Sequence, residues 1–153
     1  MSNQNISTIY LGTDHAGFEL KEFVKNFLEE EDYNIVDKGA FWYDSEDDYP
    51  DFIFPAAEAV AADKSSRGII IGGSGQGEAM AANRVPGVRA VVFYGVHDNI
   101  VKLSREHNNS NVLSIGARFV EEEEVKKLLH LWLNTEFEGG RHERRIKKLD
   151  SFG

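Results

Sequence analysis

A glycine-rich loop followed by a carboxylate is the part of this sequence best suited to chemistry. An apolar run at 68–71 leads into GGSGQG at 72–77, where four of the six residues are glycine, and Glu78 follows. Glycines in such a loop let backbone N–H groups close around an anion. The sequence therefore predicts an anion-binding loop with an acidic side chain beside it.

Two nucleotide-binding motifs match this loop poorly. A dinucleotide fingerprint has the pattern G-x-G-x-x-G after the first strand, whereas here G-x-G-x-G follows the third, with Glu78 in place of the last glycine. For a Walker loop, Gly72 and Gly77 have suitable spacing, but Glu78 replaces the lysine that meets the phosphates. Its carboxylate would repel a triphosphate, so both nucleotide hypotheses are weak.

An oxyanion hole suits the same residues better. Each loop amide that stabilises negative charge developing in a reaction contributes about 3 kcal/mol. Glu78 would be a general base, kept ionised by a helix N-terminus and contributing about 10²–10⁴ in rate. Together they could remove a proton next to a carbonyl and hold the enediolate. A tight strand-to-helix turn with an ordinary N-terminal acid remains the alternative. The loop residues assigned to this site are Gly73, Ser74, Gly75, Gln76 and Gly77.

Other ionisable side chains follow strands or lie in helices. Asp14 and His15 come after the first apolar strand, where we prefer acid/base and phosphate-contact roles to a helix cap with a solvated histidine. His107 ends a helix, a place that favours an imidazolium in any case. Three arginines could bind a phosphate, and the i, i+4 spacing of the last two puts them on one helix face: Arg118, Arg141 and Arg145.

Metal and cofactor sites are not expected. The acidic stretch at 44–51 lacks the central glycine and terminal glutamate of an EF-hand, and 142–146 lacks the second histidine of a zincin. The chain has no cysteine, which excludes thiolate ligands, disulfides and a cysteine base. We predict a protein without metal or cofactor.

Composition narrows the class of protein further. A chain of 153 residues predicts one domain, 1–153, and the formal net charge of -9 argues against nucleic acid and anionic membranes as partners. The basic run 141–148 suits a small anion, or equally a solvated helix. No signal peptide or membrane-spanning segment is recognisable, and a cytoplasmic location is the prediction.

Strand and helix patterns alternate along the chain, which predicts an α/β fold with a five-stranded parallel sheet. The usual strand order, 2-1-3-4-5, has its switch point between strands one and three. The polar loops 12–17 and 72–78 would then meet at a ligand site. Strands are predicted at 6–12, 33–37, 67–73, 88–94 and 111–117, and helices at 20–28, about 51–62, from about 76, 97–107, 121–134 and about 141–150.

Five blocks of sequence resemble the type B ribose-5-phosphate isomerases and their galactose-6-phosphate isomerase relatives, in the same order and from about Ile9 to Leu149. The resemblance implies a flavodoxin-like (Rossmann-like) three-layer sandwich and a homodimer or homotetramer with shared active sites. It also implies metal-independent aldose–ketose isomerisation of a sugar phosphate in the pentose phosphate pathway. The blocks are GTDHAGFELKEFV, DDYPDF, GGSGQGEAMAANRVPGVRA, SREHNNSNVLSIGARF and EFEGGRHERRIKKL.

The resemblance also implies roles for individual residues. Asp14 and His107 look like the pair that opens the furanose ring, with His107 and Asn108 supplied by the partner chain. Tyr49 would close over the sugar, and Ser74 with the amides of Gly75 to Gly77 would line the oxyanion hole. The phosphate would be held by His15, Arg118, Arg141 and Arg145.

One position departs from many members of this family. They have a cysteine at the position of Gly72, and this cysteine is the base that abstracts the C2 proton. A second branch lacks the cysteine and uses a glutamate one residue past the glycine loop, where this chain has Glu78. The chain is similar to that branch, so we expect the carboxylate to replace the thiolate.

Three hypotheses for function follow. The first is interconversion of ribose 5-phosphate and ribulose 5-phosphate. The second keeps the chemistry but changes the substrate to a four- or six-carbon sugar phosphate, such as a tetrose, allose or galactose 6-phosphate. The third is a non-catalytic phosphosugar-binding module, which would need the arginines but not Glu78.

Overall fold

The computed structural model describes residues 2–152 and contains one sheet of five parallel strands. The strands are β1 (Ile9–Thr13), β2 (Ile35–Asp37), β3 (Arg67–Gly72), β4 (Ala90–Phe93) and β5 (Val112–Gly116). The helices are α1 (Phe18–Glu30), α2 (Pro50–Ala62), α3 (Gln76–Ala82), α4 (Asp98–Asn108), α5 (Glu122–Asn134) and α6 (Arg141–Asp150). Two short 3-10 turns, η1 (His15–Gly17) and η2 (Ala117–Phe119), follow β1 and β5.

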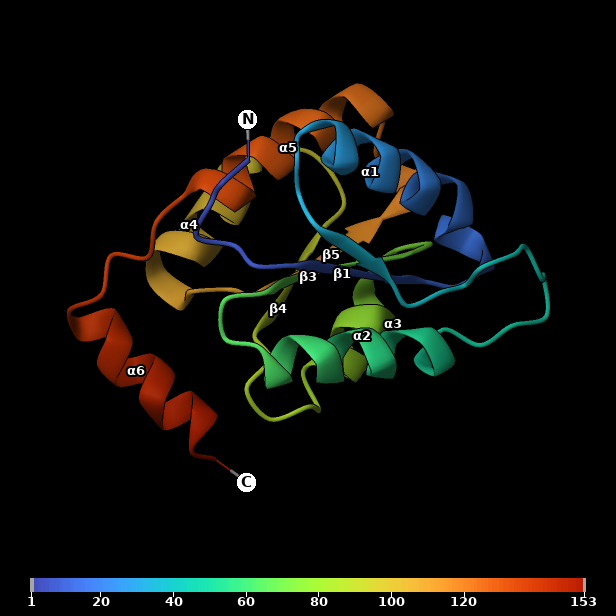
Figure 1. The fold of residues 1–153 in the computed structure, drawn as a ribbon. Coiled ribbons are helices and arrows are strands. Elements are labelled where there is room, and N and C mark those ends of the chain that lie inside the picture. The colour runs from blue at the N-terminus through green and yellow to red at the C-terminus, as the bar shows by residue number, and fades with distance from the viewer. Residues whose placement is uncertain (1, 153) are drawn as a thin grey trace.

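Helices cover both faces of the sheet (Figure 1). Helices α1, α4 and α5 enclose an apolar cluster that includes Trp132, and α2 and α3 enclose a second cluster that includes Ile53. Strand β3 serves both clusters, because Ile69 and Ile71 belong to the first and Ile70 to the second. This explains its unbroken apolar sequence. The predicted three-layer α/β sandwich is confirmed.

The strand order differs from the prediction at one edge of the sheet. The observed order is β2-β1-β3-β5-β4, so 2-1-3-4-5 is wrong in its last two strands. Burial gives the physical reason: all residues of β5 are buried, whereas most of β4 is only half-buried, as suits an edge strand. The switch point stays between β1 and β3. Because β5 borders β3, the loops that follow these two strands are neighbours.

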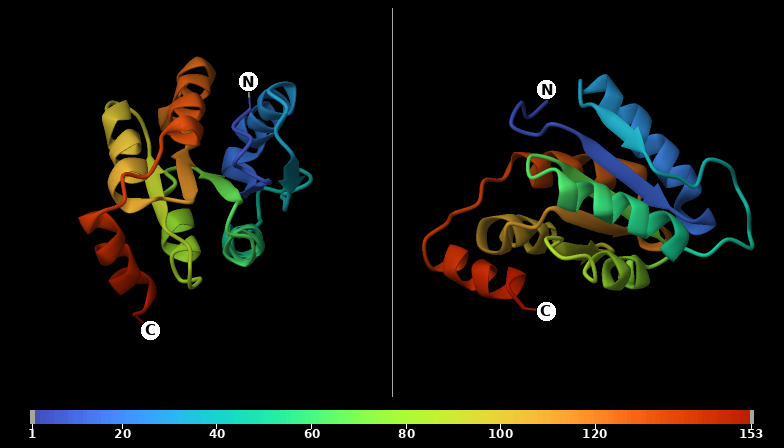
Figure 2. Two further views of the ribbon diagram at one scale, coloured as in Figure 1. Left: turned by 60° about the vertical axis from the view of Figure 1, so that its left-hand side comes forward. Right: turned by 60° about the horizontal axis from the view of Figure 1, so that its bottom comes forward.

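Helix α6 stands apart from the two helical layers and lies beside α4 (Figures 1 and 2). It buries only His142 and Ile146, and its other residues are exposed and, apart from Leu149, polar. Within residues 2–152, neither α6 nor any other helix has the length and apolar character needed to cross a bilayer.

Candidate active site

The glycine loop lies at the carboxyl edge of the sheet, between β3 and α3. Gly75 has a φ of +79°, a left-handed conformation that glycine adopts without strain. Strand β5 holds the loop, because Ser114 Oγ donates to the Gly75 carbonyl at 2.6 Å and the lack of a side chain on Gly116 admits the Ser74 carbonyl. Within residues 2–152 the amides of Ser74, Gly75 and Gly77 donate no hydrogen bond. These donors are therefore available to an anion.

Glu78 is buried in the first turn of α3, with only 5% of the residue exposed. A Cβ atom built on Gly72 would fall inside the Glu78 carboxyl group. This carboxyl therefore occupies the space that any side chain at position 72 would need. A thiol on residue 72 and a carboxyl on residue 78 are alternative occupants of one place at the end of β3.

The environment of Glu78 favours its protonated form more than the sequence suggested. Burial raises the pKa of Glu78, a hydrogen bond from its own backbone N–H lowers it, and the negative charge of Asp14 raises it further, with a net increase. The expected effect of the helix N-terminus is therefore outweighed by desolvation. A base with a raised pKa binds a proton more strongly near neutral pH, which suits general base catalysis. The turn η1, which follows β1, packs against β3, so the segments after these two strands lie close together.

Asp14 and His15 are held in place by hydrogen bonds. Asp14 accepts one from the amide of Ala16 at 3.0 Å and so caps η1. The His15 amide and its Nδ1 both contact Asp47 Oδ1, at 3.0 and 2.7 Å. The hydrogen bond to Asp47 raises the pKa of His15, as do the charges of both aspartates, against the opposing effects of burial and Arg118. A raised pKa favours the imidazolium, the form that attracts a phosphate.

Arg118 and Tyr49 border the glycine loop from two sides. The Arg118 guanidinium packs against Gly73, and a Cβ atom added to Gly73 would lie only 3.0 Å from it. The backbone N–H of Arg118 donates to the Gly73 carbonyl at 3.1 Å. The Tyr49 hydroxyl would be 2.7 Å from a Cβ atom on Gly77. Glycines thus let both side chains lie against the loop. The side chain of Gln76 is exposed, and the backbone N–H of Gln76 donates to Ser74 Oγ at 3.3 Å.

Four predicted site residues lie away from this edge: His107, Asn108, Arg141 and Arg145. Helix α4 ends at the amino edge of the sheet, where Asn108 lines a cavity with Arg89, the residue before β4. Arg141 and Arg145 are exposed on α6, which is beside α4. A single chain therefore does not bring these four residues to Glu78.

His107 belongs to a cluster with His142 and Glu138. The two imidazole rings stack at 4.3 Å, and both Nε2 atoms lie 3.7 Å from Glu138 Oε1. Burial lowers the pKa of His142, and the charge of His107 lowers it further. Ligand-type atoms lie within 4.8 Å of one another here and also in the group Asp14, His15 and Asp47. In that second group His15 Nδ1 is hydrogen bonded to Asp47. That the protein needs no metal remains a prediction from the sequence.

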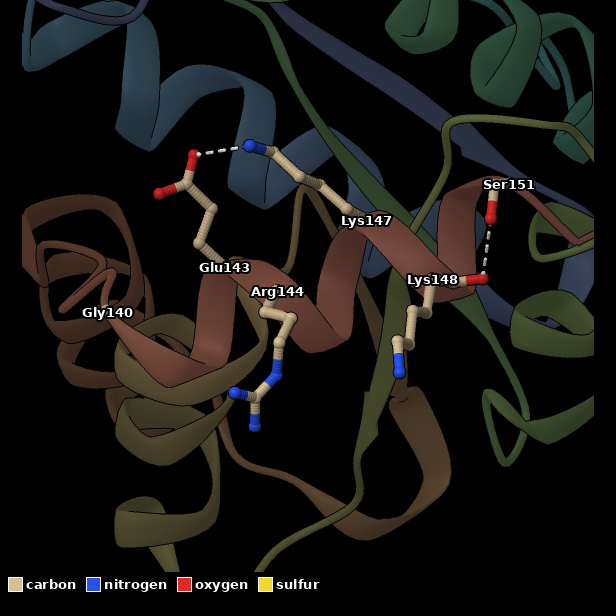
Figure 3. Close-up of a pocket in the computed structure, with 6 residues that line it drawn as sticks. All are labelled: Gly140, Glu143, Arg144, Lys147, Lys148 and Ser151. Carbon is tan, nitrogen blue, oxygen red and sulfur yellow. Dashed lines mark hydrogen bonds and ion pairs between the residues drawn. The ribbon is translucent and has the colours of Figure 1, made fainter.

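A hollow of about 500 Å³ runs along the outer side of α6 (Figure 3). Arg144, Lys147 and Lys148 give it a basic character, which Glu143 reduces by pairing with Lys147 at 3.6 Å. Arg141 and Arg145 are not among its lining residues. This hollow is therefore not the place where the two predicted phosphate-binding arginines meet.

Sequence analysis did not identify two residues that organise the site, Asp47 and Lys21. Lys21 is fully buried in α1, and its Nζ donates to both carboxylate oxygens of Asp37, at 2.8 and 2.7 Å, and to the Ala40 carbonyl. It thereby anchors the start of the segment that carries Asp47. The signal was present, because Lys21 falls three residues before Val24 on the apolar side of α1.

Replacing Asp47 with asparagine should lower the pKa of His15, because the amide cannot stabilise the imidazolium as a carboxylate does. The raised folded-state pKa of His15 stabilises the protein below the ordinary histidine pKa of about 6.5, and this contribution is lost as the pH rises through the folded value. Asp47→Asn should therefore lose most stability at acidic pH. An NMR titration of His15 and unfolding at several pH values test this, with exposed Asp48→Asn as the control. An unchanged His15 titration in Asp47→Asn would contradict it.

Comparison with known proteins identifies the family of this chain. A family model described as Ribose/Galactose Isomerase matches residues 9–149. The ribose-5-phosphate isomerase B of Mycolicibacterium paratuberculosis is 43% identical over 145 residues, which cover 94% of this chain and 90% of the relative. The Mycobacterium tuberculosis protein of the same name is 41% identical over 145 residues, covering 94% and 88%. The structure of ribose-5-phosphate isomerase B from Mycoplasma genitalium with bound ribulose 5-phosphate has a TM-score of 0.89 at 40% identity and covers 94% of this chain and 93% of its own. This chain therefore belongs to the ribose/galactose isomerase family.

Proposed function

We propose that this protein interconverts ribose 5-phosphate and ribulose 5-phosphate through an enediolate. The observation that carries the proposal is the position of the Glu78 carboxyl, which fills the space beside Gly72 next to the unpaired amides of the glycine loop. Relatives named ribose-5-phosphate isomerase B, and one such structure with bound ribulose 5-phosphate, support the choice of substrate.

In the proposed reaction Glu78 removes the proton from C2 of the open-chain aldose and returns it to C1. The electron pair of the broken C–H bond forms the enediolate, and the negative charge develops on the former carbonyl oxygen, O1. The proton of the C2 hydroxyl passes to O1, so that the C2 carbonyl of the ketose forms as the proton on Glu78 returns to C1. The amides of Ser74, Gly75 and Gly77 stabilise that charge. Asp14, whose charge acts on Glu78, takes part in opening the furanose ring together with His107 of the partner subunit.

The proposal requires a homodimer, or a homotetramer built from dimers, with active sites shared between chains. It is supported by the location of His107, Asn108, Arg141 and Arg145, which one chain places away from its own Glu78. In the assembled site, His15 and Arg118 would bind the phosphate with the two arginines of the partner subunit's α6. We also propose a cytoplasmic protein, which the absence of cysteine supports.

An activity panel with EDTA present tests the function. The purified protein should interconvert ribose 5-phosphate and ribulose 5-phosphate at full rate, because no step needs a metal. Tetrose, allose and galactose phosphates in the same panel test the alternative substrates. Sugar-phosphate binding without turnover would favour the non-catalytic module, and strict metal dependence would refute the mechanism.

Mixing two inactive variants tests the shared site. In a dimer of one Glu78→Gln chain and one His107→Ala chain, one of the two sites receives an intact Glu78 and an intact His107. Random pairing after joint refolding should therefore restore about a quarter of wild-type activity. Refolding each variant alone is the control. If the mixture stays as inactive as its components, the sites are not shared in this way.

A further inference from the structure

A polar cavity of about 140 Å³ lies at the amino edge of the sheet, opposite the edge that carries Glu78. It forms where the chain enters the strands, because Arg67 begins β3, Arg89 precedes β4 and Asn111 precedes β5. The end of α4 and the residues after α5 contribute the rest of its wall. Its charged lining residues are Lys64, Arg67, Arg89, Arg105 and Glu136.

Arg67 places a positive charge in this cavity without a paired carboxylate. Its guanidinium lies over the ring of Trp132, with Cζ 5.2 Å from the ring centroid, and Nη1 donates to the Trp132 carbonyl at 3.2 Å. Burial lowers the pKa of Arg67 to about 9, and the charge of Arg105 adds to the effect. Within residues 2–152 Arg67 forms no ion pair, so its remaining N–H groups have no charged acceptor.

Arg105 is a second buried arginine without a paired carboxylate, and only 4% of the residue is exposed. Its Nε donates to the Thr135 carbonyl at 3.1 Å, and its Nη1 donates to the Ser110 carbonyl at 2.6 Å and to Asn109 Oδ1 at 2.8 Å. All of these acceptors are neutral. Burial lowers the pKa of Arg105 to about 10. The described part of the chain offers no ion-pair partner to Arg105 either.

The charges around the cavity are unbalanced. The lining has four basic residues and one acid, in a chain whose net charge is -9. Asp150 pairs with Arg89 at 3.1 Å, but Glu136 acts on the other two arginines only from beyond ion-pair distance. Burying a cation without a counter-charge is unfavourable, and an anion that accepts hydrogen bonds from both guanidiniums would offset that penalty.

We propose that this cavity binds a small tetrahedral oxyanion such as inorganic phosphate. Arg67 and Arg105 supply charged donors, and the side-chain amide of Asn5 adds a neutral donor. The cavity volume of about 140 Å³ suits a single oxyanion and is too small for a nucleotide. This second anion site is independent of the proposed isomerase site.

Crystallography gives the first test. Crystals of the full chain grown without phosphate or sulfate and soaked in tungstate should show an anomalous peak between Arg67 and Arg105. A second peak near the glycine loop would mark the other anion site and would confirm that tungstate enters the crystal. A peak near the loop with none in the amino-edge cavity would overturn the proposal.

Thermal unfolding gives the test in solution. In an Arg118→Ala background, which weakens phosphate binding at the carboxyl edge, inorganic phosphate should raise the Tm saturably by about 2 °C or more relative to sodium chloride of equal ionic strength. Arg67→Gln should abolish this shift and exposed Lys64→Ala should reduce it, while Lys126→Ala on α5 should leave it unchanged. The change in Tm caused by phosphate is compared within each variant, so a variant with a lower Tm of its own can still be tested. A shift undiminished in both cavity variants, or a crystal peak without any shift, would refute the site.

Discussion

Replacing Glu78 with glutamine should lower kcat by about 10²- to 10⁴-fold, the contribution of a positioned general base, and leave KM almost unchanged. The amide keeps the size of the carboxyl that fills the space beside Gly72, so the glycine loop and phosphate contacts are preserved. Steady-state kinetics on ribose 5-phosphate, with sugar-phosphate binding measured separately, provide the test. Full activity in Glu78→Gln would exclude Glu78 as the base.

The same variant should be more stable than the wild type at neutral pH. Burial raises the pKa of Glu78, so the folded state holds its proton more tightly than the unfolded state does. Ionising this group as the pH rises above its unfolded value, about 4.3, therefore reduces stability in the wild type and not in the variant. The gain should shrink toward acidic pH. Glu58→Gln, an exposed position on α2, is the matched control and should change neither activity nor this pH dependence.

A cysteine at position 72 should restore activity only when the carboxyl at position 78 is removed. In the single variant Gly72→Cys the new side chain collides with Glu78, and overpacking of this kind costs about 1–3 kcal/mol. In Gly72→Cys/Glu78→Ala the thiol can occupy the vacated space. We expect this double variant to exceed Glu78→Ala about tenfold or more in kcat/KM, as recovered base catalysis would provide.

The pH profile and thiol chemistry identify the group responsible. With a thiol pKa of about 8.5, the acid limb of the double variant's profile should move to higher pH than in the wild type. Iodoacetamide should inactivate the double variant and not the wild type, which has no cysteine. Ser74→Cys/Glu78→Ala places a thiol elsewhere in the loop and is the control. If the control recovers as much kcat/KM as Gly72→Cys/Glu78→Ala, activity does not require the thiol to lie beside Gly72.

Much of the fold could be predicted from the sequence because alternating strand and helix patterns leave few architectures. The order of the last two strands could not, since β4 and β5 are both short and apolar. Contacts distinguish them: Ser114 and Gly116 of β5 fit against the loop that follows β3. Small residues at the end of a strand indicate such a close neighbour. The periodicity of apolar residues, which was used to predict the strands, does not carry this information.

The candidate site was predictable where it depends on strand ends. Asp14 and Glu78 follow β1 and β3, and parallel topology brings those ends together. Asp47 was not predictable, because its contact with His15 requires the segment after β2 to fold back across the carboxyl edge. The position of His107 away from Glu78 follows from the return of α4 to the amino edge. Roles for individual residues remain predictions for the experiments above.

The occupancy of the space beside Gly72 also determines how this edge of the sheet responds to oxidants. A thiolate there would be open to peroxide, which converts it stepwise to sulfenic, sulfinic and sulfonic acids. A carboxyl group has no such oxidised forms, and the chain contains no sulfhydryl elsewhere that could capture it in a mixed disulfide. Peroxide that would inactivate an enzyme with a cysteine at this position should leave the Glu78 carboxyl chemically unaltered.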